Sequence, residues 1–462
     1  MRPILTAILL SDMSKTIKIK KGYDVKLVGE AASTLGGTVS SSSYALKPTD
    51  FKNITPRLQL REGSNVKAGD TIFVDKDRPE INFCSPVSGE IVEVKRGEKR
   101  KILEILILAD KEISYADFGK ANPADLSAEQ VKEKLLASGA WTLLLERPFG
   151  VVANPKHEFN NVFVTGIQSS PLSADVNLQV QGEGKNLQTG INALAKLTSG
   201  KVYLSLDGDS TPASELTEVK NAEINYFSGP HPKGNVGVQM HYLAPLNKGE
   251  HALTLTAEDA IIIGRLFNEG KLDMTRTIAL AGSEVNDPKH YKAIAGVNLK
   301  DFLDKETNGG HNRFISGNIL TGTRIDKDGY LGFYNTEVSV IPEGDQEEFF
   351  AWALPGFGKF SVSRTFFSWL TPNKRYRLNS GMHGEERAFV VTGVYETVFP
   401  FDIYPVQLLK SILIRDIEKM EELGIYEVTE EDFALCEVIC PSKIPVQEIV
   451  REGLNFLRAE VS

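Results

Sequence analysis

The chain has 462 residues, of which 41% are hydrophobic and 24% are charged, and its formal net charge is -9. This length is enough for about three domains, and the composition is that of a folded protein. The acidic balance lacks the basic footprint of nucleic-acid binding. The three cysteines are too few for a disulfide framework, which favours a reducing compartment.

Residues 1–13 are interpreted as an extension or a mis-called start. They contain a short apolar run, Pro3 to Leu10, and end at a second methionine, Met13. The run is too short to cross a membrane, and the small-residue cleavage site of a signal peptide does not follow it. We therefore expect the folded chain to begin at residue 14.

Residues 14–110 have the layout of a biotinyl/lipoyl-like barrel. The turn at Gly69-Asp70 precedes a strand from Thr71 to Val74, and the turn from Ser85 to Gly89 precedes a strand from Glu90 to Val94. Apolar and polar residues alternate along these segments, as they do in half-buried strands.

Lys76 lies between these strands, where a carrier protein would present a modified lysine. Lipoyl carriers use an Asp-Lys-Ala at a tight hairpin tip, and biotin carriers place methionines on both sides of the lysine. Lys76 is instead followed by Asp77, Arg78 and Pro79 in a longer turn. An unmodified lysine on a scaffold barrel is favoured, and an acyl or biotin carrier is the alternative.

Residues 111–272 alternate strands and helices with short links, which predicts a Rossmann-like α/β domain. Strands are expected at 162–167, 201–206 and 224–227. Capping boxes predict the starts of two helices, at Ser127 and at Thr256, and glycines predict their ends, at Gly139 and Gly270.

The second half of the chain predicts two further units. Residues 273–345 turn to short strands, around 278–281, 314–315 and 331–340, which predicts a β-grasp, SLBB-like insert. Residues 346–462 predict a mainly helical C-terminal domain with an apolar stripe of Leu408, Leu409, Ile412, Leu413 and Ile417. The fold class is therefore α/β plus β, in a multidomain chain.

The cysteines argue against an iron–sulfur cluster held by this chain alone. Cys436 and Cys440-Pro441 resemble the end of a bacterial ferredoxin run, but a [4Fe–4S] cluster needs four thiolates. The third cysteine is Cys84, in the barrel module. Two packed helical cysteines, or a remnant of an ancestral cluster domain, are favoured.

No catalytic or metal-binding residue is predicted. His231, His241 and His251 lie ten residues apart, which suits no metal-ligand spacing on one helix face. The segment from His383 to Glu386 is interpreted as a polar surface loop. No Ser/His/Asp or Cys/His pattern has the context of a catalytic nucleophile.

The loop from Phe227 to Gly234 is the candidate ligand site. It follows a predicted strand, where α/β folds bind ligands, and its prolines and glycines make it a shaped turn. The candidate residues of this quinone-proximal loop are Phe227, Gly229, His231, Gly234 and the nearby His241. A histidine can hydrogen-bond a quinone carbonyl, and a pKa near neutrality suits proton exchange. A purely structural turn is the alternative.

The chain resembles the NqrA family, which supplies the large hydrophilic component of bacterial sodium-translocating NADH:quinone oxidoreductases. The resemblance is carried by blocks in order through nearly the whole chain after Met13, and it extends more distantly to the RnfC component of Rnf complexes and the flavin-binding component of complex I. The blocks include residues 17–22, 83–92, 95–100, 135–141, 171–175, 228–232, 315–322, 338–344 and 395–403.

The resemblance implies a hydrophilic subunit of a respiratory pump that couples NADH oxidation and quinone reduction to Na+ export. The implied partners are the membrane and peripheral subunits of the same complex, which would hold this chain at the cytoplasmic face of the bacterial inner membrane. The complex uses NADH, flavins, Fe–S centres and Na+. For this chain, quinone is the candidate ligand.

Two departures from the more distant relatives bear on cofactors. Those relatives carry a glycine-rich flavin loop after the helix that here ends near Gly139, whereas this chain has bulky residues from Trp141 to Pro148. The RnfC component also carries full ferredoxin-type cysteine runs, of which only Cys436 and Cys440-Pro441 remain here. We therefore expect a scaffold or quinone-proximal subunit with no flavin or cluster of its own. The alternative is an autonomous NADH-dependent flavoprotein dehydrogenase.

Overall fold

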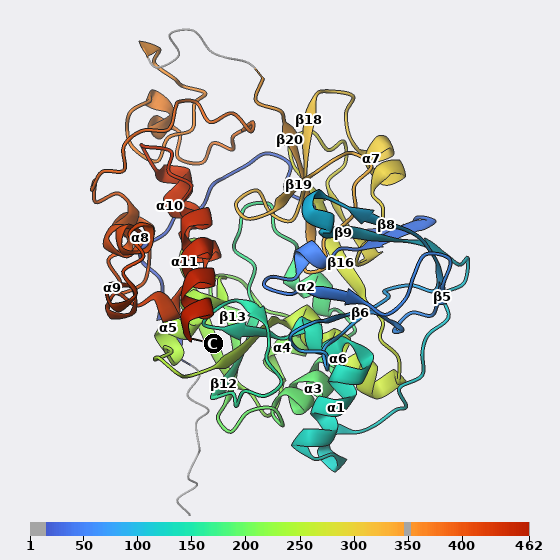
Figure 1. Cartoon of the computed structure of the whole chain (residues 1–462). Helices are drawn as coiled ribbons and strands as arrows, with labels where there is room; N and C mark the ends of the chain where they lie inside the picture. The colour runs from blue at the N-terminus through green and yellow to red at the C-terminus, as the bar shows by residue number, and fades with distance from the viewer. Residues whose placement is uncertain (1–14, 346–352, 462) are drawn as a thin grey trace, which may run out of the picture.

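The computed structural model describes residues 15–345 and 353–461, so the predicted extension and residues 346–352 of the predicted C-terminal domain lie outside it. An α/β unit, a barrel and a third sheet pack together, and the C-terminal helices lie along one flank (Figure 1). Within the described ranges, no helix combines the length and the apolar character that crossing a membrane requires.

The largest sheet belongs to the α/β unit. Its order is β1 (Thr16–Lys18), β14 (Glu223–Ser228), β13 (Val202–Asp207), β12 (Asn161–Gly166), β15 (Ala252–Thr256), β10 (Leu145–Arg147) and β11 (Val151–Val152). The first five strands are parallel, and β10 and β11 add antiparallel pairs. The strands predicted at 162–167, 201–206 and 224–227 are confirmed.

Helices cover both faces of this sheet because successive strand residues point to opposite sides. Val162 and Val164 of β12 face the core shared with α3 (Gly184–Leu194) and α6 (Ala257–Glu269). Phe163, between them, packs with Met240 of α5 (Val236–Leu243) on the other face. The shorter helices of this unit are α2 (Val176–Val180) and α4 (Ser214–Thr217).

Local capping signals set the helix boundaries as the sequence predicts. α1 (Ala128–Ser138) begins with a capping box between Ser127 and Gln130 and ends at Gly139, whose φ of 79° is left-handed. α6 begins with the capping box of Thr256 and Asp259 and ends at Gly270. Both predicted helices are confirmed.

The barrel is a sandwich of two small sheets. One contains β3 (Ser43–Leu46), β9 (Ile102–Ala109), β8 (Gly89–Arg96) and β5 (Asn65–Val66), and the other contains β4 (Pro56–Leu58), β6 (Thr71–Asp75) and β7 (Asn82–Cys84). Lys76 is exposed in the β6–β7 turn. The buried Asp75 accepts from Arg78 Nε (2.9 Å), and Arg78 donates to the carbonyl of Val152 (2.8 Å), which fixes this turn against the α/β unit.

The third sheet has the order β19 (Thr323–Ile325), β18 (Asn312–Ser316), β20 (Glu337–Pro342), β16 (Thr275–Ala281), β17 (Lys289–Ile294) and β2 (Ala32–Val39), with α7 (Lys300–Glu306) in one connection. The strand expected at 331–340 begins only at Glu337. The preceding residues form a turn, closed by the hydrogen bond from Asn335 N–H to the Gly332 carbonyl (3.2 Å).

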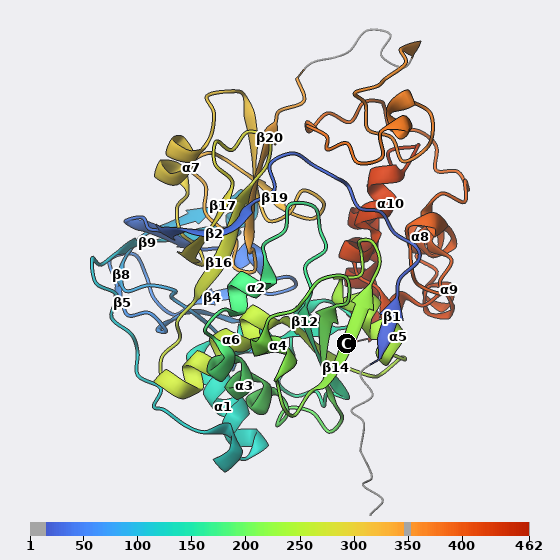
Figure 2. The ribbon, with the colours of Figure 1, turned by 180° about the vertical axis from the view of Figure 1, so that it is seen from behind.

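The N-terminal segment joins units that are distant in sequence. β1 pairs with β14 of the α/β sheet, and β2 pairs with β17 of the third sheet, as Figure 2 shows. Between them, Val28 donates to the carbonyl of Tyr376 (3.0 Å). Residues 15–39 therefore connect the units and lie outside the two barrel sheets.

The C-terminal region contains α8 (Pro405–Leu413), α9 (Ile417–Glu422), α10 (Ala434–Ile439) and α11 (Val446–Val461). Leu408, Leu409 and Ile412 are buried as predicted, but Leu413 is 54% exposed because α8 ends there. The predicted continuous stripe is wrong at this point, since Ile417 begins a separate helix. Residues 353–404 lie mostly outside helices and strands.

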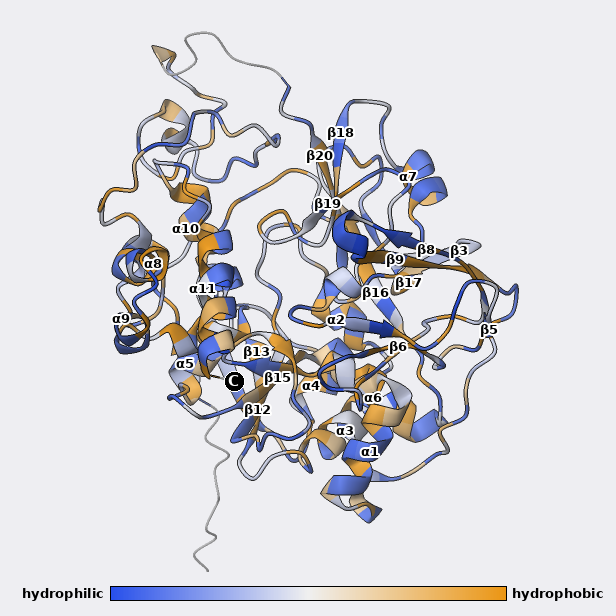
Figure 3. Ribbon diagram, in the orientation of Figure 1, coloured by the Kyte–Doolittle hydropathy of each residue, from blue (hydrophilic) through white to orange (hydrophobic). Residues whose placement is uncertain are grey.

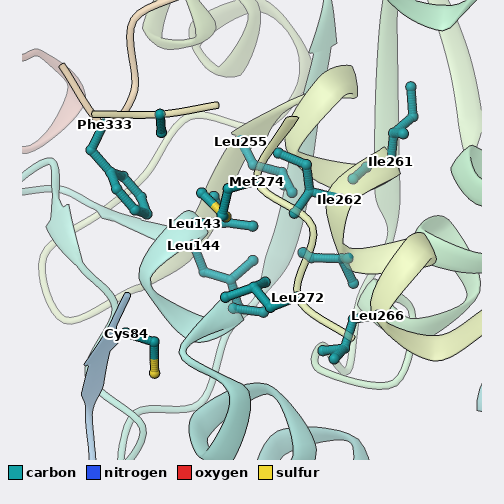
Figure 4. Close-up of a cluster of buried hydrophobic side chains, with 14 of the residues drawn as sticks. Cys84, Leu143, Leu144, Leu255, Ile261, Ile262, Leu266, Leu272, Met274 and Phe333 are labelled. Atoms are coloured by element: carbon teal, nitrogen blue, oxygen red, sulfur yellow. The ribbon is translucent and has the colours of Figure 1, made fainter. Parts of the chain in front are cut away.

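The interior of the three sheet-containing units is continuous. Hydrophobic and hydrophilic residues alternate along the helices and strands (Figure 3), and many of the hydrophobic ones are buried. Figure 4 shows part of the shared core, in which Cys84 of the barrel lies near Leu143 and Leu144, α6 contributes Ile262, and the third unit contributes Phe333. A second core joins the N-terminal segment to the C-terminal helices. The units are therefore packed as one body.

Candidate functional site

A cavity of about 300 Å³ opens at the carboxyl ends of β12 and β15. The strand order reverses between these two neighbours, which is where open α/β sheets bind ligands. Its walls come from all parts of the fold and include Lys52, Arg147, Gln168, Ser169, His231, Gly234, Asn318, Thr336, Glu337 and Glu431. This volume is at the lower end of small-molecule sites.

Ser169 connects two loops of the cavity wall. Its Oγ accepts the backbone N–H of Gly234 (2.9 Å) and lies 2.9 Å from His231 Nδ1. A Cβ on Gly234 would come within 2.7 Å of Ser169 Oγ, so only glycine allows the loops to approach this closely. The turn predicted from the sequence thus shapes one side of the cavity.

His231 is a neutral histidine in this environment. Burial lowers its pKa to about 4, and a contact with the backbone of Ser169 opposes only part of this effect. The expectation of a His231 pKa near neutrality is therefore wrong, because the imidazole is removed from the water that would stabilise its charge. A neutral ring still hydrogen-bonds, but it does not exchange protons near pH 7.

Glu337 brings a titratable carboxyl to the cavity wall from the third sheet. It is the first residue of β20, it is 5% exposed, and it accepts the backbone N–H of Ala174 (3.2 Å). Burial raises its pKa to about 7, against the opposing effect of its hydrogen bonds. Such a carboxyl can donate or accept a proton at neutral pH.

A charged network closes the cavity on the side of the C-terminal region. Arg147 Nη2 lies 2.6 Å from Glu431 Oε1, and its Nη1 lies 3.5 Å from the buried Asp432. Burial raises the pKa of Asp432 to about 6 although Arg147 lowers it. Glu430 pairs with Lys52 of the barrel unit and with Arg451 of α11. These pairs hold the C-terminal region against the cavity.

The predicted loop residues separate into two groups. His231 and Gly234 line the cavity. Phe227 is fully buried in the core, and Gly229 lies so close to Ile19 that a Cβ would come within 2.1 Å of its carbonyl oxygen. His241 Nδ1 lies 2.7 Å from Glu427 Oε2 at the contact with the C-terminal region.

Sequence reasoning missed the cavity residues that lie far from this loop. Gln168 follows β12, and its Nε2 donates to Thr336 Oγ1 (3.2 Å), which joins the α/β unit to the third sheet. Glu337 comes from that sheet. Gln168 could have been found from the sequence, because a predicted strand ends just before Gln168-Ser169-Ser170. No sequence pattern places Glu337 next to the α/β unit.

The residues at the two inherited cofactor positions fit neither a flavin nor a cluster. After Gly139, Trp141 is 1% exposed, and its Nε1–H donates to the carbonyl of Ala153 (2.8 Å), so this segment is packed core. Cys436 and Cys440 are buried, and Tyr395 donates to Cys440 Sγ (2.9 Å). The interpretation of Cys436 and Cys440 as packed cysteines is confirmed.

Three family models match the chain in order. The NqrA N-terminal barrel-sandwich hybrid domain matches residues 17–110, the NqrA second alpha/beta domain matches residues 126–272, and the NQRA C-terminal domain, which is of the SLBB type, matches residues 277–327. The barrel, the α/β unit and the third sheet thus define a multidomain protein built from these three modules.

Curated relatives cover the same range. The A subunit of the Na(+)-translocating NADH-quinone reductase is 36% identical over 447 residues in Vibrio atlanticus (strain LGP32) and 36% identical over 449 residues in Haemophilus influenzae (strain PittEE). Both alignments cover 96% of this chain and 100% of the relative. The chain belongs to the NqrA family.

Proposed function

We propose that this chain is the NqrA component of a Na+-translocating NADH–quinone reductase, an oxidoreductase complex that exports Na+. Full-length similarity carries this proposal, since 96% of the chain aligns with complete relatives that bear this name. In this role the chain assembles with the membrane and peripheral subunits of the complex, at the cytoplasmic face of the inner membrane.

We further infer a Rossmann-like α/β domain and a separate, mainly helical C-terminal domain. The parallel order β14-β13-β12-β15 supports the first inference, because it is one half of a doubly wound sheet with a switch point. The second core, formed by α8, α10 and α11 with the N-terminal segment, supports the other.

The cavity at the switch point is the proposed quinone-proximal site. His231 offers a neutral imidazole for a quinone carbonyl, and Glu337 offers a carboxyl whose pKa of about 7 suits proton transfer. Reduction of a quinone to a quinol takes up two protons, which gives such a carboxyl a role. The electrons come from cofactors of other subunits, because the residues at this chain's inherited cofactor positions fit no flavin or cluster.

Quinone binding to the purified full-length chain tests this site. A short-chain ubiquinone is titrated into wild type, His231→Ala and, as a control, His311→Ala, which removes an exposed histidine paired with Asp345. Loss of one hydrogen bond, about 1 kcal/mol, is expected to weaken binding about fivefold in His231→Ala alone. Identical affinities in all three proteins would remove His231 from the site.

Co-purification with the membrane subunits tests the assembly, and a visible spectrum of the isolated chain tests the cofactors. We expect stable association and no flavin or iron–sulfur absorbance. Quinone or dye reduction by this chain alone, with NADH and added flavin, would instead favour the autonomous dehydrogenase. Failure to associate would contradict the proposed role in the complex whatever the quinone titration shows.

A further inference from the structure

Two histidines and a glutamate that are far apart in sequence meet at the other end of the α/β sheet. Glu146 is the central residue of β10, His251 immediately precedes β15, and His157 lies between β11 and β12. β12 and β15 begin here and end at the cavity, and Glu146 lies between Leu145 and Arg147, which both line the cavity.

The sheet register explains how Glu146 and His251 meet. β10 and β15 are antiparallel, with Glu146 opposite Leu253. His251 lies two residues before Leu253, so its side chain shares the face of Glu146 in a diagonal pair. The carbonyl of His251 accepts from Asn160 N–H (2.8 Å), which fixes the backbone where the segment containing His157 enters β12.

The three side chains converge on one point. Glu146 Oε1 lies 2.7 Å from His157 Nδ1 and 2.6 Å from His251 Nδ1. The centroids of the two imidazole rings are 4.0 Å apart. One ligand atom from each of the three residues lies within 4.8 Å of the others. His251 Nδ1 is buried. It lies close to Glu146 Oε1 but has no hydrogen-bond partner among the described residues.

The groups around these three side chains favour the binding of a metal ion. The Glu146 carboxylate is 2% exposed and lies within ion-pair distance of both imidazole rings. Asn154 N–H occupies Oε2 (2.7 Å), which leaves Oε1 facing the rings. The side-chain amide nitrogen of Asn154 lies 3.0 Å from His157 Nε2, and its oxygen accepts the backbone N–H of Lys156 (3.1 Å), which fixes the amide beside the ring.

We propose that Glu146, His157 and His251 form a binding site for one Zn2+ ion, which ties the segment between β11 and β12 to β10 and β15. Two imidazoles and one carboxylate are a common zinc ligand set, and water takes the fourth position. The ligand atoms must separate slightly, because bonds of about 2.0–2.2 Å to a tetrahedral ion hold them farther apart than a hydrogen bond does. Glu146 is 2% exposed and anchors the site, while the imidazoles, with exposed side-chain fractions of 36% and 24%, leave access for the ion.

Zinc binding to the full chain, after removal of metal with a chelator, tests the site. Zn2+ alone is titrated against a chromophoric competitor with wild type, His157→Ala and His251→Ala, and with His311→Ala as the control that also breaks a histidine–carboxylate pair. We expect one zinc per wild-type and control chain, and at least tenfold weaker binding in the other two variants.

Cobalt spectroscopy provides a second readout for any variant that folds poorly. Co2+ bound to wild type is expected to give the intense visible bands of a four-coordinate site, and Zn2+ is expected to abolish them. His157→Ala changes a partly exposed loop residue and should keep the native circular dichroism. Substoichiometric zinc in wild type, or binding that is equal in wild type and both cluster variants, would overturn the proposal.

Discussion

The hydroxyl oxygen of Ser169 lies 2.9 Å from Nδ1 of His231, and it also accepts the backbone N–H of Gly234. This contact joins the loop after β12 to the loop after β14 across the end of the sheet. It places a neutral imidazole at a cavity that Glu337 also lines. The two side chains titrate differently, since burial lowers the pKa of His231 to about 4 and raises that of Glu337 to about 7.

His231 is expected to stay neutral throughout the physiological pH range. Burial lowers its pKa from 6.5 to about 4. Between these values the unfolded chain binds a proton that the folded chain does not, so this residue makes the free energy of unfolding rise with pH up to about 6.5. NMR of 13C-labelled histidine rings, assigned by the signal lost in His231→Gln, should show a midpoint near 4. A midpoint near 6.5 would contradict the burial argument.

Glu337→Gln is expected to stabilise the protein at alkaline pH. The pKa of Glu337 is raised from 4.5 to about 7 by burial, so between these values the folded chain holds a proton that the unfolded chain has lost. The contribution of this residue to stability is therefore complete below pH 4.5 and is lost as the pH rises through 7. At about 1.4 kcal/mol per pKa unit, the variant should gain roughly 3 kcal/mol over wild type at pH 8 and much less at pH 5.

Urea unfolding at pH 8 and pH 5 measures the free energy of unfolding of Glu337→Gln and wild type. Glu343→Gln is the control, because the pKa of Glu343 is shifted in the opposite direction. Hydrogen bonds from Arg313 and Ser380 lower the pKa of Glu343 to about 2, so its charged form stabilises the fold. Glu343→Gln should therefore lose stability at neutral pH. The same pH dependence in both variants would show that the burial of Glu337 does not control its titration.

Arg147→Met is expected to loosen the C-terminal region. Arg147 is 4% exposed in its side chain and faces the fully buried side chain of Asp432. Removing one member of a buried pair leaves the other charge uncompensated, which costs about 3–5 kcal/mol. The loss should be smaller at pH 5, where Asp432 is protonated. Adding Asp432→Asn should cost little more than Arg147→Met alone, and full additivity of the two changes would contradict the pairing.

The structure shows which features the sequence could predict. Ser127 with Gln130, and Thr256 with Asp259, mark helix starts because capping acts between residues three apart. The pairing of β1 with β14 spans about 200 residues, and no local pattern specifies it. His231 and Gly234 could be found because a loop at a strand end is visible in the sequence. Glu337 could not, because its position depends on how the third sheet packs against the α/β unit.

The histidine cluster shows the same limit more sharply. Spacing along the chain argues against a metal site, because His157 and His251 are 94 positions apart and no helix presents both. The β10–β15 register brings His251 beside Glu146, and the start of β12 brings His157 to the same place. Ligands that depend on sheet register are visible only once the pairing is known.

Zinc is expected to raise the melting temperature of the full chain. An ion that binds the folded form at 100 times its Kd stabilises that form by about 2.7 kcal/mol, which amounts to a few degrees in a protein of this size. The ion would hold the segment between β11 and β12 to the neighbouring strands, so hydrogen exchange in residues 153–160 should slow when it binds.

A series of thermal scans with added Zn2+ or with a chelator measures this effect. His157→Ala should melt at one temperature in both conditions, while His311→Ala should show the wild-type rise. Mg2+ at the same concentration should have no effect, because imidazole ligands favour zinc over a hard cation that prefers oxygen. An equal rise in the His157→Ala variant would assign the stabilisation to zinc bound elsewhere, and slower exchange confined to residues 153–160 would place it at Glu146.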